Sequence, residues 1–116
     1  MVPFSEFWNR LKAELAKGPS ASPGHHGVRV AKWSPYSGTI PGEFVALWQG
    51  GDVLYCETET TNSMRSVSKA EFQKVYKVWP DYRAGVRKRS YIVHDLGVQN
   101  ASWIIPILFK YEHLMK

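Results

Sequence analysis

Hydrophobic residues recur at intervals of three and four near the start of the chain, at Phe4, Phe7, Trp8, Leu11 and Leu15. Charged residues such as Arg10 and Glu14 fill the positions between them, as in a helix with one buried side. Proline is favoured at the first position of a helix, and the Gly18-Pro19 pair disfavours continuation of the helix. The pattern therefore predicts a helix over residues 3–17.

The middle of the chain has the pattern of an antiparallel sheet. Short apolar and β-branched runs, separated by turn-forming residues, predict strands at residues 28–33, 43–49, 53–60 and 64–67. Gly50-Gly51-Asp52 suits a tight hairpin, because glycine readily adopts the positive φ that such turns require. The remaining segments are rich in turn-forming residues, which predicts a loop at 18–27, a connection at 34–43 and a turn at 61–63.

A second helix is marked by its first turn. Ser68 and Glu71 have the spacing of a capping box, and Val67 and Phe72 have the spacing of a hydrophobic staple. Apolar residues then follow at helical spacing, at Phe72, Val75, Tyr76 and Trp79. Because a residue that precedes proline disfavours the helical conformation, we expect Pro80 to end this helix at Trp79.

The last segment repeats a helical pattern, at Trp103, Ile104, Ile107, Leu108, Tyr111, Leu114 and Met115. Pro106 lies inside this pattern, so the helix either begins near Ile105 or is kinked. With Ile105 and Phe109 the segment is apolar on nearly every side. We therefore expect a second subunit to bury one side of residues 103–115, which predicts a homodimer.

These elements predict one compact α+β domain spanning residues 1–116. It has an N-terminal helix, a three- to four-stranded antiparallel sheet, and two or three C-terminal helices packed on the sheet. The lone Cys56 lies in a strand-like run and is expected to be a buried apolar residue. The start of the chain lacks the pattern of a signal peptide, and Trp103–Phe109 is far shorter than the ~20 apolar residues needed to cross a bilayer. We expect a soluble cytoplasmic protein.

Net charge adds a second kind of information. The chain carries +5 in total, yet residues 1–60 hold five Lys and Arg against six Asp and Glu, whereas residues 61–116 hold ten against four. The whole excess of positive charge therefore lies in the C-terminal half, which favours an anionic partner.

The basic run after the second helix is the candidate nucleic-acid contact, formed by Arg83, Arg87, Lys88 and Arg89, with Lys74 and Lys77 extending it across that helix. The segment from Tyr91 to Phe109 also resembles a helix-turn-helix, with Gln99, Asn100 and Ser102 at the positions that would read bases. A solvated face that keeps a small protein soluble explains the same charges equally well.

A small-molecule pocket is the alternative, because the chain has 14% aromatic residues and places Trp33, Tyr36 and Trp48 around a glycine- and proline-rich connection. We find no paired acids, nucleophile with a base, or nuclease-like spacing, so the sequence predicts no catalytic residue and no cofactor. Neighbouring residues on an extended chain point to opposite sides, so the His25-His26 pair predicts no metal site.

One pattern in the C-terminal half resembles a known group of proteins. The string F-x3-Y-x2-W-x2-Y-x2-G-x3-R is filled from Phe72 to Arg89, and N-x-S-W-I-I-x-I-L follows from Asn100 to Leu108. About 40 residues thus resemble short bacterial proteins carried on mobile gene cassettes of the integron type, or lying near restriction systems. The chain departs from that pattern at Trp103 and Pro106. The resemblance implies a compact α+β domain able to pair with itself, and it implies no activity.

Overall fold

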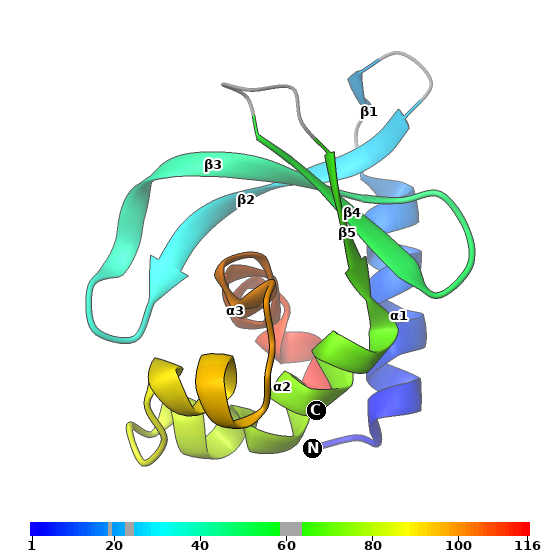
Figure 1. Ribbon diagram of the computed structural model, residues 1–116. Helices are drawn as coiled ribbons and strands as arrows, with labels where there is room; N and C mark the ends of the chain where they lie inside the picture. Colours follow the sequence, from blue (N-terminus) through cyan, green and yellow to red (C-terminus); the bar gives the residue numbers. More distant parts are fainter. Residues whose placement is uncertain (19, 23–24, 59–63) are drawn as a thin grey trace.

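The computed structural model describes residues 1–18, 20–22, 25–58 and 64–116. The elements follow one another as α1 (Phe4–Lys17), β1 (Ser20–Ser22), β2 (His25–Ser34), β3 (Gly38–Trp48), β4 (Val53–Thr58), β5 (Met64–Ser68), α2 (Lys69–Arg83), η1 (Tyr91–Asp95), α3 (Ala101–Lys110) and η2 (Glu112–Met115). The sheet arches over α3, and the helices lie on the side toward which it curves (Figure 1). The predicted α+β fold is confirmed.

The described strands are antiparallel and lie in the order β1-β2-β3-β4-β5. The predicted antiparallel sheet is confirmed as β2 to β5, and the short β1, which pairs Ser20 with His26, adds an edge strand that was not predicted. Residues 18–27 were expected to form a loop, but where they are described they contribute to β1 and β2. Residues 19, 23–24 and 59–63 lie outside the described ranges. The predicted turn at 61–63 and the expected end of the third strand fall among them.

The β2–β3 hairpin is longer than the sequence suggests. We expected residues 34–43 to be an irregular connection, but only residues 35–37 form the turn. The Ser34 Oγ accepts hydrogen bonds from the backbone N–H groups of Tyr36 (3.2 Å) and Ser37 (3.1 Å), and Gly38 follows with a φ of +67°. This side-chain-closed turn needs so few residues that both strands continue almost to the tip.

The first helix forms as predicted and packs its apolar side into the core, through Phe7, Trp8, Leu11 and Leu15. The Trp8 Nε1 donates a 3.2 Å hydrogen bond to Asp52 in the β3–β4 turn. That hydrogen bond, followed by the charges of Lys69 and Lys12, holds the pKa of Asp52 below its usual value, although desolvation opposes them. The contact joins α1 to the turn between β3 and β4.

The second helix begins as predicted but ends later. The Ser68 Oγ accepts a 3.3 Å hydrogen bond from the Glu71 N–H, which confirms the cap. The expected end at Trp79 is wrong, because Pro80 lies inside α2 and the helix runs to Arg83. A proline in a helix interior removes one backbone hydrogen bond and costs roughly 3 kcal/mol. The extra turn buries the Tyr82 ring, which is 1% exposed, and this burial offsets the cost.

The apolar third helix is buried by its own chain. Its residues Ile104, Ile105, Pro106, Ile107 and Leu108 are all buried, and α3 packs chiefly against β2. The helix begins at Ala101, not near Ile105, and continues through Pro106. The sheet therefore covers the side that we expected a second subunit to cover, and the homodimer stays a prediction without that support. None of the helices in the described ranges combines the length and apolar character needed to span a bilayer.

Candidate functional site

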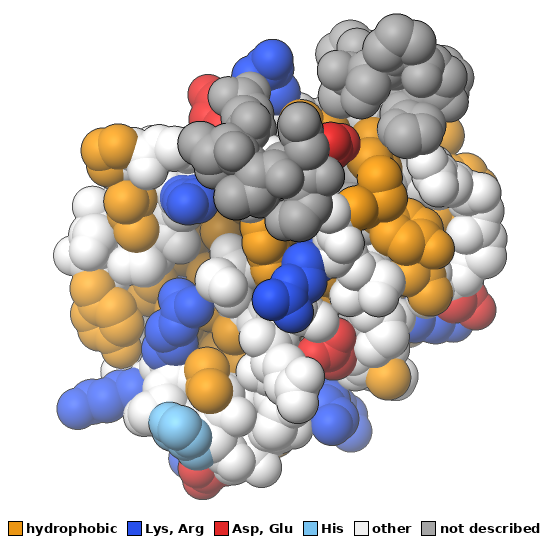
Figure 2. Space-filling model, turned by 45° about the horizontal axis from the view of Figure 1, so that its top comes forward, with side chains coloured by type: hydrophobic (Ala, Val, Ile, Leu, Met, Phe, Trp, Pro, Cys, Tyr) orange, Lys and Arg blue, Asp and Glu red, His pale blue; other side chains and the backbone are white. Residues whose placement is uncertain are grey.

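The six basic residues expected to contact nucleic acid divide between two places. Lys74, Lys77 and Arg83 lie on α2, whereas Arg87, Lys88 and Arg89 lie in the connection between α2 and η1. On the face that Figure 2 presents, Lys and Arg side chains are separated by other residues and mixed with Asp and Glu. The positive charges of that face do not merge into one continuous area, so each candidate has to be judged by its own surroundings.

Arg83 is held by the fold. Its Nε lies 3.2 Å from both carboxylate oxygens of Glu112. Its guanidinium lies 5.2 Å from the ring centroids of both Trp33 and Phe109, and these rings stack on one another at 3.9 Å with a 6° angle between their planes. Arg83 thus joins α2, β2, α3 and η2, and its guanidinium is not free to meet a partner as an isolated surface cation would be.

The two candidate lysines of α2, Lys74 and Lys77, differ in the same way. The Lys74 Nζ donates a 3.2 Å hydrogen bond to the backbone carbonyl of Leu96, which anchors the segment before α3. Lys77 is exposed and has no acidic partner among the described residues. Of these two lysines, Lys77 is therefore the one that remains available to a ligand.

The connection after α2 presents its cations from a fixed backbone. The Asp81 carbonyl accepts hydrogen bonds from the N–H groups of Val86 (2.8 Å) and Arg87 (3.2 Å), and the Lys88 carbonyl accepts one of 3.0 Å from Tyr91. Gly85 supplies the turn with a φ of +82°, which few other residues adopt. The chain therefore leaves α2 in one direction set by its own hydrogen bonds.

Arg87, Lys88 and Arg89 are all exposed in this connection. The Arg87 guanidinium lies 4.5 Å from the centroid of the Tyr91 ring, and the residue stays exposed. None of the three forms an ion pair with an acidic residue in the described part of the chain. We call residues 87–89 the basic segment.

The helix-turn-helix interpretation is wrong. A recognition helix must present one side to the DNA groove, but the corresponding helix α3 is buried from Ile104 to Leu108. One of the expected base-reading side chains, that of Asn100, is also used within the fold, whereas Gln99 contributes only its backbone N–H. The Glu71 carboxylate accepts hydrogen bonds from the Gln99 N–H (3.2 Å) and from the Asn100 Nδ2 (2.9 Å).

The three aromatic residues of the alternative hypothesis do not come together. Trp33 is 8% exposed and stacked on Phe109, whereas Tyr36 at the hairpin tip is 64% exposed. Trp48 lies at the other end of β3, where its Nε1 donates a 3.0 Å hydrogen bond to the Gly51 carbonyl. Thr39, the β3 partner of Trp33, is nine residues from Trp48, which at ~3.3 Å per residue is about 30 Å along the strand.

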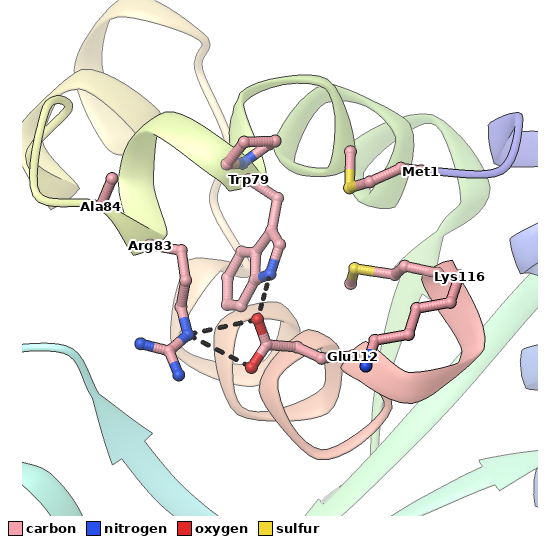
Figure 3. A pocket seen from close by; sticks show the side chains of 8 residues that line it. Met1, Trp79, Arg83, Ala84, Glu112 and Lys116 are labelled. Atoms are coloured by element: carbon pink, nitrogen blue, oxygen red, sulfur yellow. Dashed lines mark hydrogen bonds and ion pairs between the residues drawn. The ribbon is translucent and has the colours of Figure 1, made fainter.

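A pocket that the sequence did not predict lies between α2 and η2 (Figure 3). It has a volume of about 430 Å³ and is lined by Met1, Trp79, Pro80, Arg83, Ala84, Glu112, Met115 and Lys116. The Glu112 carboxylate accepts a 3.0 Å hydrogen bond from the Trp79 Nε1 in addition to its pairing with Arg83. The spacing of Trp79 and Arg83, one helical turn, was visible in the sequence, but the expected helix end at Trp79 concealed it.

The described residues give little support to metal binding or to a cysteine nucleophile. The described residues contain no cluster of three or more His, Cys, Asp or Glu side chains able to hold a metal ion. Cys56 is buried in β4, as predicted, and this burial raises the pKa of its thiol to about 12. A thiol with so high a pKa is a poor nucleophile at neutral pH. Comparisons of the chain with protein-family models, with curated proteins and with solved structures found no match.

Proposed function

We propose that this protein is a non-enzymatic cytoplasmic accessory protein, of the kind carried on mobile gene cassettes, that contacts nucleic acid or another polyanion through the basic segment. The observation that carries the proposal is the contrast among the candidate cations. Arg83 and Lys74 are engaged within the fold, whereas the basic segment and Lys77 present exposed charges without acidic partners among the described residues.

The rigid backbone of the connection supports this role. Three adjacent cations on a flexible loop would lose conformational freedom on binding, and that loss weakens association. The hydrogen bonds to the Asp81 and Lys88 carbonyls order the loop beforehand. With three or four phosphates neutralised, counterion release predicts that affinity falls roughly 40- to 150-fold between ~50 and ~200 mM salt.

The test is a titration of mixed-sequence DNA at these two salt concentrations. We expect binding at tens of micromolar protein or below in the lower salt, a range typical of non-specific contacts. The variant Arg87→Ala, Lys88→Ala, Arg89→Ala should lose most of this binding. A matched control is Lys17→Ala, Lys110→Ala, Lys116→Ala, which removes the same charge from exposed positions elsewhere.

The comparison of the two variants decides the proposal. Retained binding in the control and lost binding in the first variant would support a contact at the basic segment. Equal losses would show that only net charge matters, and an absence of DNA binding by the native protein in the lower salt would contradict the proposal outright.

Small-molecule binding remains a second candidate, now directed to the pocket of Figure 3 in place of the three dispersed rings. Its volume of about 430 Å³ falls within the range usual for ligand sites. A thermal-shift screen of aromatic and cationic compounds tests it. A true pocket ligand should raise the unfolding temperature of the native protein but not that of an Ala84→Trp variant, whose indole would occupy the space.

A further inference from the structure

The turn of the β2–β3 hairpin presents an aromatic ring to solvent. Tyr36 is 64% exposed, and it is the only aromatic ring among the exposed large hydrophobic side chains of the described residues. Its backbone is fixed, because the Ser34 Oγ accepts hydrogen bonds from the N–H groups of both Tyr36 and Ser37. The ring therefore projects from a turn whose backbone is held by two hydrogen bonds.

The same turn faces the region from which the basic segment emerges. Figure 1 shows the β2–β3 turn and the chain that follows α2 on the same side of the molecule. The two regions are in contact, since the Arg83 guanidinium in the last turn of α2 lies 5.2 Å from the centroid of the Trp33 ring, three residues before Tyr36. Tyr82 lies in the same turn of α2, and its buried hydroxyl has no hydrogen-bond partner among the described residues.

Two residues from separate parts of the chain affect the pKa of the Tyr82 hydroxyl. Burial raises the pKa of Tyr82, the positive charge of Arg89 lowers it and Tyr36 raises it. These charge effects agree with the contact between Arg83 and Trp33, which brings the end of the hairpin to the end of α2. The turn that carries Tyr36 and the connection that carries the basic segment are therefore neighbours on one side of the molecule.

A second ring accompanies the same cations. Tyr91 is half-buried and carries the Arg87 guanidinium 4.5 Å from its centroid. Two rings, those of Tyr36 and Tyr91, thus accompany the cations of the basic segment on this side of the molecule. Single-stranded nucleic acid is bound by this combination, in which bases stack on rings and cations follow the phosphates. A duplex keeps its bases stacked inside and offers a ring on the protein surface no comparable partner.

We propose that the polyanion of this protein is single-stranded nucleic acid, with Tyr36 stacking on a base and the basic segment neutralising the adjacent phosphates. The inference rests on the proposed function, and it names the form of nucleic acid. It also assigns Tyr36, for which the fold shows no internal role, to the same surface as Arg89.

The experiment measures fluorescence anisotropy of a labelled single strand of about 20 nucleotides, longer than the ~4–16 nucleotides that one small domain usually covers. The same sequence as a duplex and heparin serve as the other two probes. We expect Tyr36→Ala to weaken single-strand binding roughly 5- to 150-fold, as alanine substitution of a stacking ring usually does. Tyr36→Phe keeps the ring and should bind like the native protein.

Ile40→Ala is the matched control, since Ile40 is an exposed apolar residue on the same hairpin. It should leave all three affinities unchanged, as should Tyr36→Ala for duplex and heparin. Urea denaturation of each variant verifies that folding is intact.

The outcomes separate this inference from the proposed function. If Tyr36→Ala binds the single strand like the native protein while the triple alanine variant of the basic segment does not, the inference is overturned and the proposed function stands. Equal weakening by Tyr36→Ala for heparin, duplex and single strand would also overturn it, because stacking cannot act on heparin. If the native protein binds none of the three probes, both proposals fail together.

Discussion

Replacing Arg83 with alanine should lower the free energy of unfolding and do so independently of any nucleic acid. The side chain joins α2 to Glu112 through 3.2 Å contacts and lies 5.2 Å from the centroids of Trp33 and Phe109. Its charge is therefore engaged by a carboxylate and by two aromatic rings at once. The cations of the basic segment have no carboxylate partner among the described residues, and only Arg87 among them contacts a ring.

The expected size of the effect follows from those contacts. Each cation–π contact at a partly exposed position contributes about 0.5–1 kcal/mol. The side chains of the ion pair are 43% and 32% exposed, so solvent screening limits the pair to about 0.2–1 kcal/mol. Together the losses amount to about 1–3 kcal/mol. With a urea m-value of about 1.5 kcal/mol/M, the midpoint of unfolding should fall by about 0.7–2 M.

Urea denaturation followed by circular dichroism measures this shift, and Arg89→Ala is the matched control. Arg89 is exposed and unpaired among the described residues, so its removal should change stability by no more than about 0.5 kcal/mol. A double-mutant cycle with Glu112→Gln isolates the ion pair, because glutamine still accepts the hydrogen bond from Trp79. The reasoning would be refuted if Arg83→Ala and Arg89→Ala unfolded at the same urea concentration.

Three further predictions concern single groups. Tyr82→Phe removes a buried hydroxyl without a partner among the described residues, so it should leave stability unchanged or raise it by up to about 1 kcal/mol in urea denaturation. Cys56, with a pKa raised to about 12 by burial, should react with a thiol reagent at pH 8 only as fast as the protein unfolds, so rapid modification of the native state would contradict its placement. Asp52 has a pKa lowered by its hydrogen bond from Trp8, so its contribution is present above its unfolded pKa of about 3.9 and is lost as pH falls through the folded value. Asp52→Asn should therefore be less stable than the native protein at pH 6 and equally stable near pH 2, and a constant difference across that range would disprove the linkage.

The parts of the fold that the sequence predicted are those set by local chemistry. The cap at Ser68 and the apolar spacing of α1 depend on residues within one or two turns of each other. The end of α2 was predicted wrongly because Pro80 is a strong local signal, whereas the burial of Tyr82 that outweighs it depends on the rest of the fold. The hairpin was predicted too short for a similar reason, since the Ser34 hydroxyl closes a turn that composition alone suggests is longer.

The candidate site shows the same limit more sharply. In the sequence, Arg83 and the basic segment are a single run of charges without any distinction among them. The structure separates them, because the carboxylate that engages Arg83 belongs to Glu112, 29 residues further along the chain. The contact of Arg83 with the Trp33 ring spans a sequence separation that is longer still. Pairings of this kind have no local pattern, so the sequence could identify the charges without assigning their roles.

The unexpected length of α2 explains why structural and available cations lie so near one another. Had the helix ended at Trp79, Arg83 would not lie one turn beyond it, and Glu112 could not accept hydrogen bonds from both side chains. The same additional turn buries Tyr82 and brings the Asp81 carbonyl to the point where it orders the following connection. The continuation of α2 past Pro80 thus places Arg83 where Glu112 engages it. It also fixes the point at which the basic segment leaves the helix. The position of the basic segment consequently depends on the packing of α2. A variant that destabilises α2 could lose ligand binding for that reason alone, so stability and binding have to be measured separately.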